Sequence, residues 1–110
     1  MMGINEFAKI VHENAVRHGW WEEEREFPEI AALIHAEISE ALEEYRDGHA
    51  PGEIYFGEAG KPEGVPVELA DAMIRIMDYC VRAGIDIESV MLRKHEYNVD
   101  RPYRHGGKRC

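Results

Sequence analysis

The sequence predicts an all-α fold in a single domain. Apolar residues recur at helical spacing in four segments, glycine or proline separates these segments, and strand signals are nearly absent. The chain has 110 residues, which is enough for one core and too few for a second core of similar size. We therefore expect more than half of the residues in helices, with little or no sheet.

The first two predicted helices cover residues 4–18 and 28–47. Gly19 is a natural stop for the first helix. Pro28 suits the first turn of the second helix because its missing N–H costs nothing there, and Gly48 lies just beyond the end of that helix.

Residues 48–65 contain five glycines and two prolines and predict a long loop, with a short strand-like piece at 54–56. Loops of this length in a small domain often bind ligands, and a plain surface connection is the alternative. The third helix is expected over residues 66–83. Asp86 can cap a fourth helix that runs to about Tyr97, and a polar tail follows.

Charge is distributed unevenly along the chain. The net charge of −9 argues against binding to a nucleic acid polymer, because a phosphate backbone would be repelled. Residues 101–110 carry four basic and no acidic side chains, whereas residues 1–100 carry 9 basic and 22 acidic ones. An acidic body with a basic tail suits a protein that binds cations and then a polyanion such as a nucleotide, and a solvated acidic surface is the alternative.

The sequence predicts a cytoplasmic protein without a membrane segment. No apolar run approaches the roughly 18 residues that a membrane span needs. The amphipathic N-terminal segment carries Glu6 and Glu13, which is not typical of a signal peptide. Two cysteines are too few for a disulfide framework, so a reducing compartment is expected.

Glu37 is the first candidate for chemistry, because it falls inside the apolar stripe of the second helix. Ile34 lies three positions before it and Ala41 four positions after it. A buried carboxylate is costly unless it is paired, here with an arginine such as Arg75, or bound to a metal. Glu40 and Glu44 follow at three and seven positions and project from the same side of the helix.

A second acidic pair, Glu68 and Asp71, opens the third helix. If the two helices face each other, four carboxylates meet around one point, and hard oxygen ligands of this kind suit Mg²⁺ or Mn²⁺. Solvated surface charge is the alternative. The six histidines have no clear ligand partner and are expected at the surface or satisfied in the core. The predicted metal ligands are Glu37, Glu40, Glu68 and Asp71.

Both acidic pairs resemble motifs of the MazG-like branch of the all-α NTP pyrophosphohydrolases. The segment 33–42, LIHAEISEAL, resembles the first acidic motif, and the segment 67–76, VELADAMIRI, resembles the second. The stretches 94–98, KHEYN, and 101–108, RPYRHGGK, resemble the C-terminal Lys/Asn element and tail of the family. The family often has an additional Glu just before the first ligand, where this chain has Ala36.

The resemblance implies a four-helix bundle completed by homo-oligomerisation, as a dimer or a tetramer. It implies hydrolysis of a nucleoside triphosphate to the monophosphate and pyrophosphate, with Mg²⁺ held by the four predicted ligands. Nucleotide pool cleaning is the usual role of such enzymes. A catalytically weak helical module that binds nucleotides or a protein partner is the alternative function.

The remaining candidate residues have expected roles in catalysis or substrate binding. Glu37 is expected to act in catalysis as a metal ligand. Glu40 or Glu44 can accept the proton of the attacking water as a general base. Basic residues can bind phosphate, Asn98 can bind phosphate or sugar, and an aromatic ring can stack on a base. Solvent-exposed charge, and packing of the tryptophans in the core or a subunit interface, are the alternatives. The predicted substrate-binding residues are Trp20, Trp21, Lys94, Asn98, Arg101 and Arg104.

Overall fold

The computed structural model describes residues 1–109, and Cys110, the last residue of the predicted basic tail, lies outside them. Most of the described chain is helical, so the all-α prediction is confirmed. The long helices begin and end within about two residues of the predicted bounds. They are α1 (Ile4–Arg17), α2 (Phe27–Arg46), α3 (Val65–Arg82) and α4 (Ile87–Val99).

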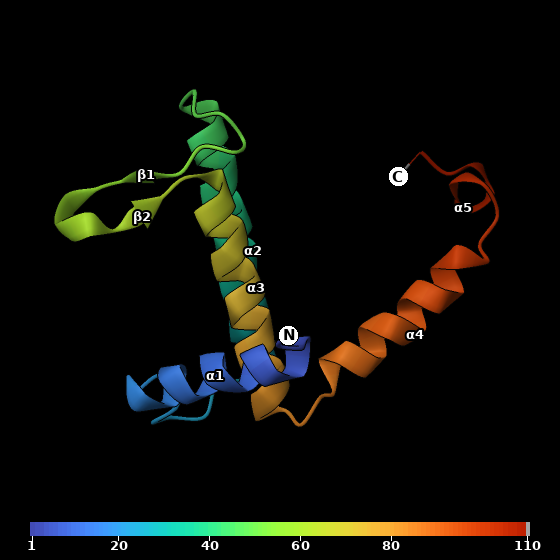
Figure 1. The fold of residues 1–110 in the computed structure, drawn as a ribbon, viewed down its shortest axis with the longest axis horizontal. Helices are drawn as coiled ribbons and strands as arrows, with labels where there is room; N and C mark the ends of the chain where they lie inside the picture. Colours follow the sequence, from blue (N-terminus) through green and yellow to red (C-terminus); the bar gives the residue numbers. More distant parts are fainter. Residues whose placement is uncertain (110) are drawn as a thin grey trace.

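Helices α2 and α3 lie side by side and antiparallel, and α1 crosses one end of the pair (Figure 1). Small buried residues lie on all three helices, among them Ala8 on α1, Ala41 on α2 and Ala72 on α3. Their size lets the helix backbones approach closely. The core therefore sits among α1, α2 and α3, and these helices with their connections (residues 1–86) form what we call the body.

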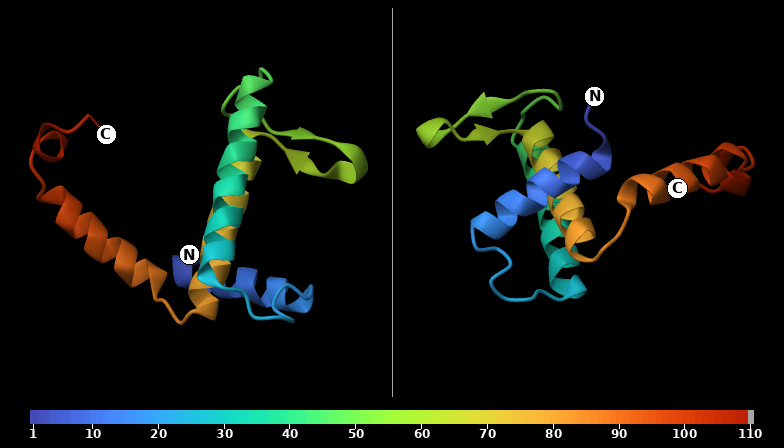
Figure 2. Two further views of the ribbon diagram at one scale, coloured as in Figure 1. Left: turned by 180° about the vertical axis from the view of Figure 1, so that it is seen from behind. Right: turned by 60° about the horizontal axis from the view of Figure 1, so that its bottom comes forward.

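A small hairpin fills the predicted loop between α2 and α3. Strand β1 (Tyr55–Phe56) pairs antiparallel with β2 (Pro62–Glu63), and the 3₁₀ turn η1 (Glu58–Gly60) joins them. The hairpin projects sideways from the helix pair (Figure 2). Gly64 follows it with a φ of +128°, and a Cβ there would lie 2.3 Å from the Glu53 carbonyl oxygen. Only glycine fits this turn, which leads directly into α3.

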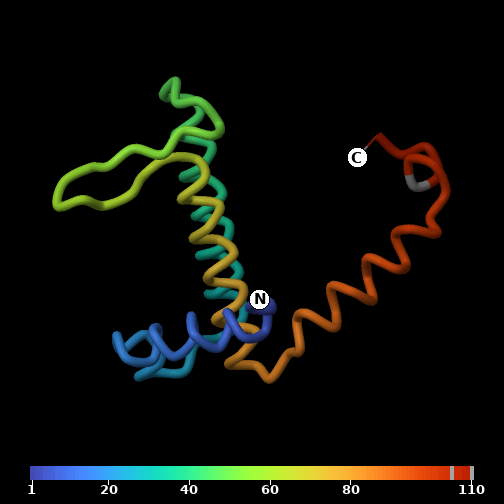
Figure 3. The backbone as a smooth tube through the Cα atoms, viewed as in Figure 1, coloured from blue at the N-terminus to red at the C-terminus, as the bar shows by residue number. Residues whose placement is uncertain are grey.

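Helix α4 begins at a joint with α1 and then leaves the body. The Asp86 carboxylate caps the helix by accepting a hydrogen bond from the Ser89 N–H at 3.0 Å, as the sequence predicts. The Asn5 side-chain amide donates to the same carboxylate at 2.7 Å. Beyond this joint α4 points away from α2 and α3, and the short helix α5 (Arg104–Gly107) lies at its far end (Figure 3).

We call residues 87–109 the arm. Because the arm does not pack along α2 and α3, one chain does not form a four-helix bundle by itself. Completion of the bundle by a second copy stays a prediction. Within residues 1–109, no helix is both long and apolar enough to cross a membrane.

Candidate metal centre

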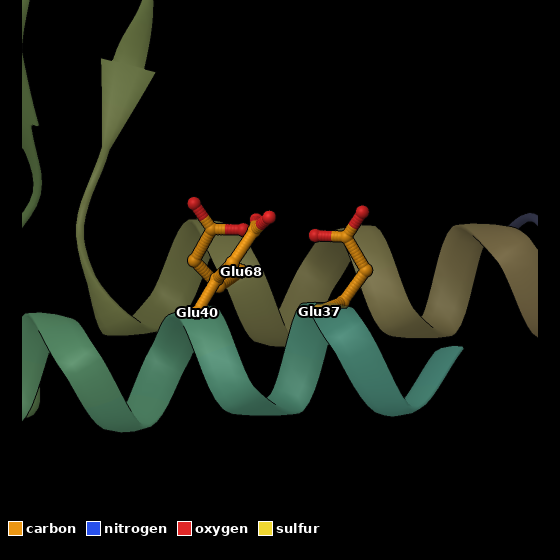
Figure 4. A group of neighbouring side chains, drawn as sticks. All are labelled: Glu37, Glu40 and Glu68. Carbon is orange, nitrogen blue, oxygen red and sulfur yellow. The ribbon is translucent and has the colours of Figure 1, made fainter. Parts of the chain in front are cut away.

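Three glutamates from two helices meet where α2 and α3 face each other. Glu37 and Glu40 lie one turn apart on α2, and Glu68 lies in the first turn of α3 (Figure 4). One carboxylate oxygen from each residue lies within 4.8 Å of the others. We call these three residues the glutamate cluster. The structure thus brings together three of the four predicted metal ligands.

The cluster has a buried side and an open side. Glu37 is only 8% exposed, as its place in the apolar stripe predicts, and Glu68 is half-buried. Glu40 is exposed. A ligand can therefore enter past Glu40 and reach the two less exposed carboxylates.

Burial and the neighbouring carboxylates disturb the protonation of Glu68. Burial, followed by hydrogen bonding and repulsion from Glu37 and Glu40, raises the pKa of Glu68 to about 8. A protonated Glu68 can donate a hydrogen bond to Glu37. Without that proton, Glu37 Oε2 and Glu68 Oε2 are both buried with no hydrogen-bond partner among the described residues. When Glu68 is ionised, the glutamate cluster thus contains two buried carboxylate oxygens without a positively charged partner.

Arg75 on α3 holds the other oxygen of Glu37. Its Nε–H donates to Glu37 Oε1 at 3.0 Å. Burial alone would raise the pKa of Glu37, but the hydrogen bonds from Arg75 and Glu68 and the Arg75 charge outweigh it and lower that pKa. The buried carboxylate that the sequence identifies therefore has an arginine partner on one side only.

Asp71, the fourth predicted ligand, lies outside the glutamate cluster and beside it. It lines a cavity of about 350 Å³ together with Glu37, Arg75, Trp20 and Asp78. Burial and then the charge of Glu37 raise the pKa of Asp71, while Arg75 opposes the rise. Asp71 is thus close enough for the charge of Glu37 to raise its pKa, and it lines the cavity beside the glutamate cluster.

Glu44 does not join the cluster, although the sequence offers it as a catalytic base. Both of its carboxylate oxygens accept from the Tyr55 hydroxyl, at 2.9 and 2.8 Å. This interaction raises the pKa of Tyr55 to about 12. Because Tyr55 belongs to β1, Glu44 fastens the hairpin to the end of α2. Of these two residues, Glu40 is the one that belongs to the glutamate cluster.

The two tryptophans have different environments. Trp21 is 7% exposed, and its indole N–H donates to both oxygens of Asp78, at 2.9 and 3.1 Å. This is the core packing that was the alternative to substrate binding. Trp20 lines the cavity, but the guanidinium of Arg25 lies 3.6 Å from its ring centre. One face of Trp20 is therefore already covered.

The predicted phosphate-binding residues lie on the arm and not at the cluster. Lys94 and Asn98 belong to α4, and Arg101 and Arg104 follow it. Since the arm points away from α2 and α3 (Figure 1), a single chain does not bring these residues to the glutamate cluster.

The sequence reasoning missed a buried polar network behind the cavity. His12 Nδ1 lies 2.7 Å from Asp78 Oδ1, and Asp78 is 6% exposed. From the sequence, Arg75 and Asp78 share the polar edge of the third helix with Glu68 and Asp71, a position that does not predict burial. The available signal was their spacing: Asp71, Arg75 and Asp78 recur at intervals of four and three, which places them on one helix face.

Comparison with known proteins adds no relative. No protein-family model, no curated protein and no solved structure matches the chain.

Proposed function

We propose that the protein is a Mg²⁺-dependent nucleoside triphosphate pyrophosphohydrolase that yields the monophosphate and pyrophosphate. The observation that carries this proposal is the convergence of Glu37, Glu40 and Glu68, with two buried carboxylate oxygens that have no partner among the described residues once Glu68 is ionised. The proposed setting is nucleotide pool cleaning in the cytoplasm, consistent with the resemblance of the two acidic motifs to the MazG-like enzymes.

The residues present fit a hard divalent cation. All three members of the cluster offer carboxylate oxygens, and Asp71 adds a fourth beside them. Oxygen donors of this kind suit Mg²⁺, with Mn²⁺ as a substitute, and the thiolate or imidazole ligands typical of zinc are not part of the cluster. Bound there, Mg²⁺ supplies charge neutralisation of the polyphosphate and a more acidic water.

The chain's own residues have distinct parts in this proposal. Glu37 and Glu68 hold the cation from two helices, which fixes its position relative to the body. Glu40 lies on the exposed side, where it can accept a proton from the attacking water. Trp20, on the wall of the adjoining cavity, is the aromatic residue placed to contact the base.

The proposal includes assembly of a homodimer or homotetramer. Ile38, Leu42 and Tyr45 on α2 are 48%, 56% and 60% exposed, and Met73 on α3 is 58% exposed. Apolar surface of this extent on one helix pair is typical of an interface. In such an assembly the basic residues of one copy's arm can approach the glutamate cluster of another, which accounts for their distance from it within one chain.

The test is pyrophosphate release from a panel of ribo- and deoxyribonucleoside triphosphates, with and without Mg²⁺. Glu40→Gln removes a charge of the cluster and should lower turnover by about 10²-fold or more, the size of a general-base contribution. Glu43→Gln is the matched control. Glu43 is an exposed residue on the same helix that pairs with Arg46, so this variant should keep wild-type turnover.

Two results would contradict the enzyme. One is no Mg²⁺-dependent pyrophosphate release from any triphosphate. The other is release that Glu40→Gln and Glu43→Gln leave equally unchanged. Nucleotide binding without turnover would instead favour the helical binding module.

A further inference from the structure

Arg75 lies between two partners of different kinds beside the glutamate cluster. Its Nε donates to Glu37 Oε1 at 3.0 Å, and its guanidinium carbon lies 5.2 Å from the centre of the Trp20 ring. Among residues 1–109, neither of its terminal NH₂ groups has a hydrogen-bond acceptor. The side chain is 30% exposed and lines the 350 Å³ cavity. The guanidinium is thus held at one nitrogen and free to bind at the other two.

The positive charge of Arg75 stabilises the Glu37 carboxylate, as a bound cation would. It neutralises a carboxylate that is 8% exposed and crowded by Glu40 and Glu68. A divalent cation in the cluster would take over this role and would repel the guanidinium. Arg75 on Oε1 and a cation on Oε2 would repel each other across the same carboxylate, so binding of one weakens the hold of the other.

We propose that Arg75 exchanges partners when the site fills: it pairs with Glu37 in the metal-free protein and binds a substrate phosphate once a cation occupies the glutamate cluster. This inference rests on the metal site and the substrate class of the proposed function. The fork of a guanidinium matches two oxygens of one phosphate, and Arg75, which lines the cavity next to Glu37, has two terminal NH₂ groups without an acceptor among residues 1–109.

The first experiment measures Mn²⁺ binding by titration of the wild type and Arg75→Gln. The variant should bind Mn²⁺ about tenfold more tightly, because the competing charge is gone. Arg46→Gln is the matched control. It removes the same charge from an exposed ion pair with Glu43 on the outer side of α2, and it should bind Mn²⁺ like the wild type. The control separates competition at Glu37 from the general effect of net charge.

The second experiment measures the affinity for inorganic pyrophosphate at saturating Mn²⁺. Arg75→Gln should bind pyrophosphate about tenfold more weakly than the wild type, whereas Arg46→Gln should not. Melting curves without metal confirm that the variants fold. If Arg75→Gln does not fold, Arg75→Lys is measured instead, because lysine keeps the positive charge and lacks the two-pronged donor geometry of the guanidinium. Its Mn²⁺ affinity should stay near the wild-type value, and its pyrophosphate affinity should fall.

The outcomes separate this inference from the proposed function. A wild type that binds no Mn²⁺ overturns both. A wild type that binds Mn²⁺ and hydrolyses triphosphates, with an Arg75→Gln variant of unchanged or weaker Mn²⁺ affinity, overturns the exchange alone. Tighter Mn²⁺ binding with unchanged pyrophosphate affinity also overturns it, since Arg75 would then be a counter-ion only.

Discussion

The body and the arm are built from similar helices and have opposite properties. Residues 1–86 carry 7 basic and 19 acidic side chains, whereas residues 87–109 carry 6 basic and 3 acidic ones. The body buries Ile30, Ala72 and Cys80 among its helices. In the arm, Leu92 and Tyr97 are 60% and 63% exposed. The body is acidic and has its own core, and the arm is basic and has none.

This difference separates two kinds of helix stability. Helices α2 and α3 are stabilised by packing along a shared face, and the same face positions the glutamate cluster. Helix α4 depends on its Asp86 cap and its joint with Asn5, because a helix of 13 residues is marginal in water without packing. A partner outside the chain is the simplest source of the missing packing. Substitutions in the body and in the arm should therefore have different consequences.

The largest expected effect comes from Glu37→Gln in the body. Loss of this ligand should lower Mg²⁺-dependent turnover by about 10³-fold, because the metal both positions and activates the attacking water. The metal-free protein should be less stable than the wild type but still folded, because the half-buried Arg75 guanidinium loses the charge of its carboxylate partner. Activity assays, run beside thermal melts with and without Mg²⁺, check both points. A variant with near-normal turnover would defeat the ligand assignment.

The next effect concerns stability, and it compares the body with the arm directly. Asp78→Ala leaves the buried Trp21 N–H and His12 without their acceptor and should cost about 3 kcal/mol of unfolding free energy. Asn98→Ala, on the exposed arm, should change that free energy by less than about 0.5 kcal/mol. Denaturant unfolding of both variants measures the difference. Equal losses would mean that the arm belongs to the same cooperative unit as the body.

A third effect is on association. Met91 and Leu92 on α4 are 48% and 60% exposed, and Leu92→Glu should weaken self-association about tenfold or more if the arm packs against a second copy. Glu96→Gln, also on α4 and exposed, is the control and should leave association unchanged. Analytical ultracentrifugation measures both. A wild type that sediments as a monomer of 12.7 kDa at micromolar concentration would remove the basis of this prediction.

The sequence was informative about the helices and the acidic pairs because both depend on local spacing. The position of Glu37 relative to Ile34 and Ala41 was enough to predict its burial, and the cap at Asp86 was readable from its residue type. Local spacing was not enough to show that Arg75 pairs with Glu37, because that contact joins residues 38 positions apart on two helices. Periodicity fixes which side chains share a face, and the register between two helices decides which of them meet.

The direction of the arm could not be predicted from the spacing of residues either, for a different reason. The apolar residues of α4 predict a buried face, yet they do not say whether the covering surface is in the same chain. The basic residues from Lys94 to Arg104 resemble a phosphate-binding element, and their distance from the glutamate cluster follows from the direction in which α4 leaves the body (Figure 1).

The smallest expected effect is a pH dependence that belongs to the body and not to the arm. The pKa of Glu68 is raised to about 8 in the folded protein, chiefly by burial and by hydrogen bonding with Glu37. The folded state therefore holds this proton more tightly than the unfolded state does. Stability from Glu68 is fully present at acidic pH and is lost as the pH rises through about 8.

Without metal, the wild type should thus lose about 1 kcal/mol between pH 5 and pH 8, a modest amount because Glu68 is only half-buried. Glu68→Gln should remove most of this slope, since the amide does not titrate. Glu96→Gln, on the arm, should keep the wild-type slope. Thermal melts of the three proteins in chelator at several pH values give the comparison. A slope that Glu68→Gln leaves intact would show that the proton responsible sits elsewhere, and the crowding of the glutamate cluster would then no longer support a cation site.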